Sequence, residues 1–451
     1  EGYDKVTDWR ALFKQFASAY KGAVVPDREL YRGDLLAANV AACEDLIIAT
    51  PELAAELGIP IRVDLRKRFV TYADGMEWVW QTYSNKFNRH LCNYLHPARL
   101  GNGAFAYDIQ WRSVMLWPAG KMDGSLPGAD PEREKRLTEY ILSELAPNSA
   151  ILGFPYAGEH VGMGEVYGVK LASQYAKPLV CNDSLANLSV MSGVQISRLK
   201  QKAQPLLPVL DKSKIYVALV LSDGDNQNCW LAFMKKYFDH KRFGEFSLAF
   251  GMGPAIFDLM PAVAQWYYEK GGSSTEFISD VSGIGYIQPQ NYGTAFADRQ
   301  AVYDGFLDWT GRYLKRLDMG TVRTVEGKDE MLRQYARKIP DMHSLFADMG
   351  RYSGREGITN LTYTLPEGMP VFRAVTSWRF GTNSFPREIR EQVGSVRPAF
   401  VNGFLHCWTY KDFELICKLY DERPADMVFV TPRQLAALYQ QAQRSTSNAG
   451  R

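Results

Sequence analysis

The stretch that decides the fold is IYVALVLSDGDN, residues 215–226. A continuous run of apolar and β-branched residues ends abruptly in the polar turn 222–226. Such a run, followed by turn residues, predicts a strand buried on both faces, as in parallel sheets covered by helices. Ligands bind beyond the carboxyl ends of such strands. Asp223, Asp225 and Asn226 are therefore candidates for chemistry.

The chain after residue 213 repeats this pattern, with helical periodicity between short apolar runs. Seven or eight such units in about 240 residues predict an α/β fold with a C-terminal (β/α) barrel-like domain. A doubly wound open sheet is the alternative. The strands are expected at 215–221, 246–250, 276–281, 321–325, 344–348, 371–376, 399–405 and 427–430.

Small α/β domains are expected before the barrel. We predict a small α/β segment at 1–60 and a helical or mixed subdomain at 61–146, with an aromatic-rich helical stretch at 76–94. A small α/β subdomain at 147–207 follows, because its apolar run, helical pattern and second apolar run predict a βαβ unit. The barrel-like catalytic domain then covers 208–451.

Composition limits the class of protein. The 451 residues are 46% hydrophobic and have a net charge of +2. This content supports sizeable cores, and the absence of a long basic block argues against nucleic acid as a partner. No apolar stretch is long enough for a membrane span. The six cysteines form no C-x-x-C pair, so no metal site and no cofactor are expected.

A second motif begins after the apolar run 277–281 and has the sequence SGIGYIQP. Gly283 and Gly285 allow backbone conformations, or a close approach to the backbone, that side chains would forbid. Tyr286 adds a flat aromatic face and a hydroxyl. A lone GxG at 251–253 lacks the third glycine of a dinucleotide fingerprint and is explained by a strand-to-helix turn.

The segment GIGYIQP resembles the signature of the GxGYxYP family, whose members are classed as glycoside hydrolases. Gly283, Gly285, Tyr286 and Pro289 match, whereas Gln288 stands where the family name has Tyr. SDGDN at 222–226 and the segment 182–190 are also similar to family segments. The resemblance implies a carbohydrate substrate, an oligo- or polysaccharide, and a periplasmic or secreted location.

Four carboxyl groups are the candidate catalytic residues. Asp223 and Asp225 follow the first barrel strand, and Asp280 and Asp348 end two later ones. Hydrolysis of a glycosidic bond needs a pair of carboxyl groups, one of which protonates the leaving oxygen. A capping role in the next helix is an equal alternative for Asp225 and Asn226.

The candidate substrate-binding residues share positions near predicted strand ends: Asn226, Gly283, Gly285, Tyr286, Trp378 and His406. Trp378 could stack on a sugar or cover the core as a rim aromatic. His406 fits either a site or a satisfied loop position. A polysaccharide deacetylase-like enzyme and a non-catalytic carbohydrate-binding protein remain alternatives to a hydrolase.

Overall fold

The structure is a computed structural model of the 451-residue chain. It describes residues 6–97, 100–101, 104–117, 120, 124–155, 163–182, 184–325, 327–348, 361–377, 385–405 and 411–449. The chain divides into two compact units, 1–171 with 184–189 and 172–183 with 190–451. The domain boundaries expected at 60, 146 and 207 stay predictions.

The N-terminal unit begins with a small parallel sheet. Its middle strand β1 (Ala23–Val25) pairs with β2 (Ile47–Ile48) and with β3 (Ile61–Asp64). The helix α2 (Gly33–Glu44) is buried over almost its whole length and packs against α4 (Tyr72–Tyr83). Thr71 caps α4 through its side chain in a reciprocal capping box with Asp74, which fixes where that helix starts. The other helices here are α1 (Trp9–Gln15), η1 (Ala17–Ala19) and α3 (Pro51–Leu57).

A second parallel sheet lies later in this unit. Its strand β4 (Leu91–Tyr94) pairs with β5 (Val114–Leu116) and β6 (Ala150–Gly153). The helical stretch expected at 76–94 is therefore wrong at its end, because the helix α4 stops at Tyr83. Cys92 and Tyr94 are buried in the sheet, where side-chain packing overrides helical periodicity. The helices that follow are α5 (Phe105–Trp111), α6 (Pro131–Glu144) and α7 (Glu165–Gln174).

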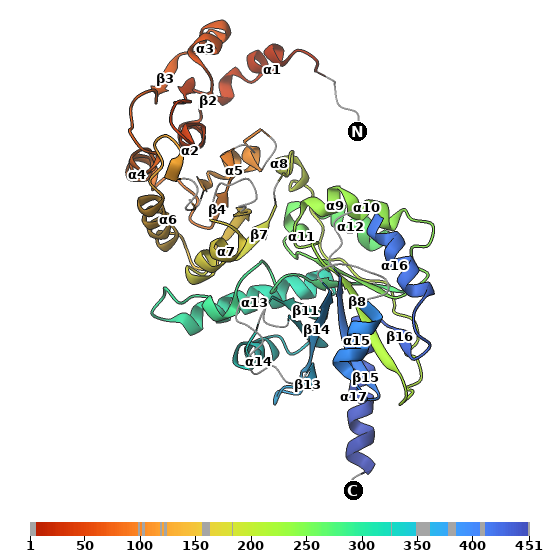
Figure 1. The fold of residues 1–451 in the computed structure, drawn as a ribbon. Coiled ribbons are helices and arrows are strands. Elements are labelled where there is room, and N and C mark those ends of the chain that lie inside the picture. Colours follow the sequence, from red (N-terminus) through yellow and green to blue (C-terminus); the bar gives the residue numbers. More distant parts are fainter. Residues whose placement is uncertain are drawn as a thin grey trace. The chain divides into compact units, whose positions relative to one another are not determined.

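The C-terminal unit contains a closed parallel barrel of seven strands (Figure 1). The strands follow the order β12-β11-β10-β9-β8-β15-β14, and β14 pairs back to β12 to close the ring. The predicted α/β barrel fold is confirmed, and the open sheet is excluded. The strands are β8 (Ile215–Leu221), β9 (Leu248–Met252), β10 (Thr275–Ser279), β11 (Thr321–Thr324), β12 (Ser344–Ala347), β14 (Pro370–Ser377) and β15 (Ala399–Leu405).

Two further strands extend this sheet. The strand β16 (Met427–Phe429) pairs with the start of β8, whose end pairs with β9 instead. The strand β13 (Thr362–Thr364) pairs antiparallel with β14. Helices connect the strands: α9 (Asn228–Leu231), α10 (Phe233–Phe238), α11 (Ile256–Leu259), α12 (Pro261–Lys270), α13 (Arg299–Leu317), α14 (Asp329–Lys338), α15 (Phe385–Val393), α16 (Lys411–Asp421) and α17 (Pro432–Ala449), with η4 (Pro289–Asn291) before α13.

The barrel strands are buried along their length, which explains their unbroken apolar sequences. Every residue of β8 and of β15 is buried. Tyr216 stacks on Phe400 across these two strands, with ring centroids 5.7 Å apart. Large aromatic side chains of this kind contribute much of the buried area of a core. The carboxyl ends of the strands are thus held by a rigid framework.

One short strand from the sequence before the barrel belongs to the same unit. The backbone of β7 (Leu179–Cys181) forms a bridge to Tyr286 in the loop after β10. The N–H of Gln227 also donates to the carbonyl of Cys181, at 2.9 Å. A further short helix among the described residues is α8 (Leu188–Met191). Among the helices of the described residues, none has the length and apolar composition needed to cross a membrane.

Candidate active site

The acidic turn after β8 packs closely on the end of β9. The carbonyl of Gly224 accepts hydrogen bonds from Trp230 Nε1 and from the N–H of Gly253, both at 2.8 Å. A Cβ on Gly224 would lie 1.7 Å from the carbonyl oxygen of Gly251, so only glycine fits. Asp223 next to it has a φ of +71°, in the left-handed region. Non-glycine residues in this region cost free energy and cluster at functional sites.

The GxG at the end of β9 leaves room for the acidic residues. A Cβ on Gly251 would lie 2.2 Å from Oδ2 of Asp280. A Cβ on Gly253 would lie 2.5 Å from Nε2 of Gln227 and 3.0 Å from the carbonyl oxygen of Asp225. These glycines let the end of β9 approach the residues that follow β8 and β10. The GxG therefore permits close packing, in addition to the strand-to-helix turn expected from the sequence.

Arg323, in the middle of β11, joins two of the predicted carboxylates. Its Nε donates to Oδ1 of Asp280, and its Nη1 donates to both carboxylate oxygens of Asp348, at 3.1 and 3.0 Å. Its Nη2 lies 3.4 Å from Oγ of Ser222, which also lies 3.4 Å from Oδ2 of Asp280. The guanidinium packs 4.4 Å from the ring centroid of Phe404. Arg323 on β11 therefore contacts residues on or directly after four other barrel strands, β8, β10, β12 and β15.

A second arginine holds the chain after β12. Arg373 on β14 donates to the carbonyl of Asp348 at 3.3 Å and to the carbonyl of Gly327 at 3.1 Å. Its Nη2 also donates to the hydroxyl of Tyr363, at 2.9 Å. Asp348 is thereby fixed through its carboxylate by one arginine and through its backbone by another.

Burial and mutual repulsion set the protonation of this cluster. Burial, the charge of Asp280 and the charge of Asp223 together raise the pKa of Asp225 to about 8, against opposing effects of Arg323 and Cys181. Burial also raises the pKa of Asp280, although Arg323 opposes the shift. Burial alone would lower the pKa of Arg323, but the charges of Asp280, Asp348 and Asp225 outweigh it, so its pKa is raised. Arg323 is therefore ionised throughout.

These pKa shifts divide the carboxyl groups into two kinds. Asp280 and Asp348 share the positive charge of Arg323. Asp225 has no ion pair with it and is half-buried at the strand end, and its raised pKa lets it retain a proton near neutral pH. A carboxyl group with a raised pKa beside other carboxyl groups is an arrangement that acid–base catalysis uses.

Asn226 binds the backbone at the start of α9, although the capping position of that helix is occupied by Gln227. Its Oδ1 accepts the backbone N–H of Asn228, the first residue of α9, at 3.2 Å. The backbone N–H of Asn226 in turn donates to the carbonyl of Asp223, at 3.1 Å. Asn226 therefore stabilises the acidic turn, and a contact with substrate stays a prediction.

The GxGYxYP-like segment forms part of the loop after β10 and packs against α13 and β7. Gly283 has a φ of +118°, and a Cβ there would lie 2.5 Å from Oγ1 of Thr310 on α13. A Cβ on Gly285 would lie 3.0 Å from the carbonyl oxygen of Leu179 on β7. Tyr286 is 4% exposed, and its backbone N–H donates to the same carbonyl at 2.7 Å. The motif joins α13, β7 and the strand end, and its substrate-binding role stays a prediction.

The structure brings Asp223, Asp225, Asp280 and Asp348 to one end of the barrel, as predicted from their positions after strands. Trp378 and His406 lie outside the described residues. Sequence reasoning missed Arg323, although a lone arginine inside the buried run Thr321–Thr324 was a signal. Within the described ranges, no three His, Cys, Asp or Glu side chains are placed to hold a metal ion.

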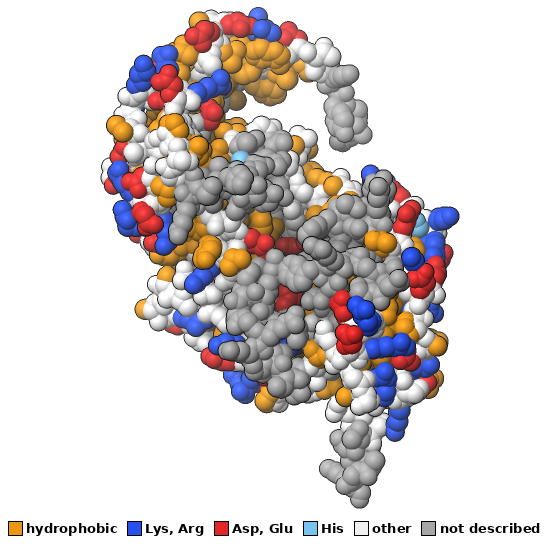
Figure 2. Space-filling view, viewed as in Figure 1, with side chains coloured by type: hydrophobic (Ala, Val, Ile, Leu, Met, Phe, Trp, Pro, Cys, Tyr) orange, Lys and Arg blue, Asp and Glu red, His pale blue; other side chains and the backbone are white. Residues whose placement is uncertain are grey.

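Charged side chains of both signs are intermingled on the face of the molecule shown in Figure 2. This agrees with the small net charge of +2. A nucleic-acid-binding surface instead gathers Lys and Arg on one face or along one stripe.

Comparison with known proteins gives a family and a structural neighbour. A crystal structure described as a putative hydrolase from Bacteroides thetaiotaomicron VPI-5482 matches with a TM-score of 0.77 and 19% identity, over 97% of this chain and 84% of that one. At this identity the likeness shows the fold alone. No curated protein matches the sequence at a significant level.

A second solved structure, described as a putative polysaccharide deacetylase from Mycobacterium smegmatis, matches with 12% identity and a TM-score of 0.37, over 55% of this chain and 96% of that one. A similarity this low supports no argument. Family models match residues 20–87 and 90–193, as the second and third domains of GxGYxYP proteins. The model described as "GxGYxYP putative glycoside hydrolase C-terminal domain" matches 213–440. The chain belongs to the GxGYxYP family.

Proposed function

We propose that this protein is a glycoside hydrolase that cleaves an oligo- or polysaccharide at the carboxyl end of its barrel. The family description names this class of enzyme, and the barrel places its acidic residues where such folds place active sites. The proposed location, periplasmic or secreted, follows from the same class of substrate.

One observation carries the proposal: burial and the charges of Asp280 and Asp223 raise the pKa of Asp225, which lies among three other carboxyl groups at the strand ends. Glycoside hydrolysis needs one carboxylic acid that protonates the leaving oxygen and one carboxylate that attacks the sugar or activates water. Asp225 has the raised pKa of the acid. Asp223 lies two residues away, outside the ion pairs of Arg323, and is the proposed carboxylate.

Asp280 and Asp348 have a positioning role in this proposal. Both are buried and bound to Arg323, whereas Asp223 is only partly buried. The negative charge of Asp280 acts on Asp225 by raising its pKa. The buried network thus keeps the acid protonated at the pH at which it must donate.

The test is a panel of oligo- and polysaccharides assayed for released reducing ends. Asp225→Asn and Asp223→Asn should each lower the rate on any cleaved glycan by about 10²–10⁴, because each removes a group that acts in the transition state. Asp239→Asn is the matched control, since Asp239 is an exposed acid that pairs with Lys235 on α10. Its rate should equal that of the unaltered chain.

Two results would overturn the proposal. One is the release of acetate without new reducing ends, which would favour a deacetylase. The other is a cleaved glycan whose rate is unchanged in both Asp223→Asn and Asp225→Asn. Circular dichroism of each variant shows whether a lost rate reflects lost chemistry or a lost fold.

A further inference from the structure

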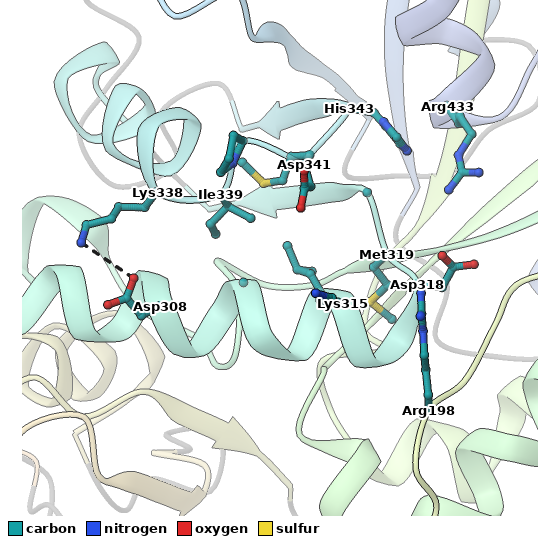
Figure 3. Close-up of a pocket in the computed structure, with 15 residues that line it drawn as sticks. Arg198, Asp308, Lys315, Asp318, Met319, Lys338, Ile339, Asp341, His343 and Arg433 are labelled. Atoms are coloured by element: carbon teal, nitrogen blue, oxygen red, sulfur yellow. Dashed lines mark ion pairs between the residues drawn. The ribbon is translucent and has the colours of Figure 1, made fainter.

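A cavity of about 540 Å³ lies at the amino ends of β11 and β12. Its walls come from the C-terminal part of α13, the end of α14, the residues before the two strands and the first turn of α17 (Figure 3). Gly320 and His343 directly precede these strands, whereas Asp280 and Asp348 lie beyond the other ends of barrel strands. This cavity is therefore separate from the candidate active site.

Three cationic side chains line this cavity without a carboxylate partner among the described residues. They are Arg198, Lys315 on α13 and Arg433 at the start of α17. Nε of Arg433 is buried and has no hydrogen-bond partner there. A buried donor without a partner is unfavourable, and a bound acceptor would satisfy it. Three separate parts of the chain thus supply donors to one space.

The carboxylates of the cavity offset only part of this charge. Asp308 is paired with Lys338, at 3.8 Å. Asp318 accepts the backbone N–H of Gln201 at 3.1 Å, and Asp341 is exposed at the rim. Among the side chains that line the cavity, the three unpaired cations outnumber Asp318 and Asp341 by one. Glu276 lies outside this lining, and its Oε2 accepts the backbone N–H of Arg433 at 2.9 Å.

His343 adds a donor or acceptor without adding charge. Burial and the nearby charge of Arg433 lower its pKa, and Asp318 opposes the shift, so the imidazole is neutral at pH 7. A Cβ on Gly320 would lie 2.2 Å from the ring, which is therefore tightly held. In Figure 3 the side chains of His343 and Arg433 point toward Asp318. The polar end of the cavity is thus fixed in place.

We propose that this cavity binds a small organic anion through a phosphate or carboxylate group. Arginine binds both groups through paired N–H donors, and a cavity of a few hundred Å³ is the usual size for a metabolite. Met319, Ile339 and Met342 supply an apolar wall for the carbon skeleton of the ligand. The ligand is bound at the amino ends of the strands, so it is not the glycan that the barrel is proposed to cleave.

Isothermal titration of the full chain with citrate, glucose 6-phosphate, inorganic phosphate and glucose tests this proposal. At least one of the three anions should bind, and neutral glucose should not. Lys315→Gln and Arg433→Gln should each weaken that binding about tenfold or more, because each removes a charged donor. Arg312→Gln, one turn before Lys315 on α13 and outside the cavity lining, should leave it unchanged.

The choice of anion identifies the ligand class. Tighter binding of citrate than of glucose 6-phosphate favours a polycarboxylate, and the reverse favours a phosphate ester. Failure of all three anions to bind at about 10 mM would overturn the proposal. Binding that Lys315→Gln leaves unchanged would also overturn it, since Lys315 is exposed on its helix and its replacement does not disturb the core. Hydrolysis of a glycan is not measured, so this outcome is independent of the proposed function.

Discussion

Asp225 and Asp280 lie close enough for the charge of one to raise the pKa of the other. If Asp225 is the acid, the rate should fall as the pH rises through its raised pKa. Asp280→Asn removes a negative charge and keeps the shape of the side chain, so the pKa of Asp225 should fall. We predict that the alkaline limb of the pH–rate profile moves to lower pH in Asp280→Asn and stays in place in Asp239→Asn. An unmoved limb in Asp280→Asn would show that Asp225 is not the acid.

The ion pairs of Arg323 lead us to predict that replacing this residue causes a loss of stability that depends on pH. Arg323→Gln leaves Asp280 and Asp348 buried without a countercharge, which should cost about 3–5 kcal/mol near neutral pH. The pKa of Asp280 is already raised and should rise further in the variant. A carboxyl group with a raised folded-state pKa favours folding below its unfolded pKa and loses that contribution as the pH rises toward the folded value.

The loss of unfolding free energy in Arg323→Gln, relative to the unaltered chain, should therefore be larger at pH 8 than at pH 5. Urea denaturation at both pH values measures this difference. Arg337→Gln is the control, because Arg337 forms an exposed pair with Glu367 that contributes little. A deficit that is equal at both pH values would mean that Asp280 stays ionised without Arg323.

At the scale of elements, the glycines at the end of β9 predict a sensitive position. Gly251→Ala places a methyl group 2.2 Å from Oδ2 of Asp280, within a strand that cannot shift without disturbing its neighbours. Overpacking of this kind costs about 1–3 kcal/mol and should displace Asp280 from Arg323. Gly272→Ala is the control, since the nearest atom to its Cβ would be 4.0 Å away. Thermal unfolding of both variants checks the prediction, and a Gly251→Ala transition that matches the control contradicts it.

The sequence predicts the barrel elements well because their burial is complete. Strands β8 and β15 were expected at 215–221 and 399–405 and lie at those residues. Fully buried strands have unbroken apolar runs, whereas β3 is largely exposed, with the sequence IRVD, and was not foreseen. The stretch 91–94 continues the helical periodicity predicted from residue 76, but its side chains are buried in a sheet and packing there decides the structure.

The candidate site was only partly predictable for a related reason. Asp223, Asp280 and Asp348 each follow a predicted strand, and this alone predicts that they lie at the same end of a barrel. The distances between them do not follow from the sequence. The ion pairs of Arg323 depend on which barrel strands are neighbours, and β10, β11 and β12 are neighbours only once the sheet order is known. The same limit applies to β7, whose contact with Tyr286 joins segments about a hundred residues apart.

At the scale of the whole molecule, that contact predicts where the C-terminal unit begins. The family model starts at residue 213, but the compact unit includes 172–183. Leu179 and Cys181 are buried and bind the loops that hold Tyr286 and Gln227. A fragment 172–451 should therefore unfold at a higher temperature than a fragment 190–451, by several degrees, since burying one such apolar side chain contributes about 1.5–3 kcal/mol.

Both fragments keep Gln201, whose side chain bridges the backbone of Phe277 and Asp318. The comparison therefore measures the segment 172–189, in which Ser173 also binds the backbone N–H of Gln288. Scanning calorimetry of the two fragments measures the difference. Replacing Leu179 by alanine in the longer fragment should recover part of it, because that side chain is 1% exposed. Equal transition temperatures would mean that β7 stabilises the first unit instead. Since Cys181 also forms a hydrogen bond with Asp225, loss of β7 should further alter the pH dependence of any hydrolysis the fragment retains.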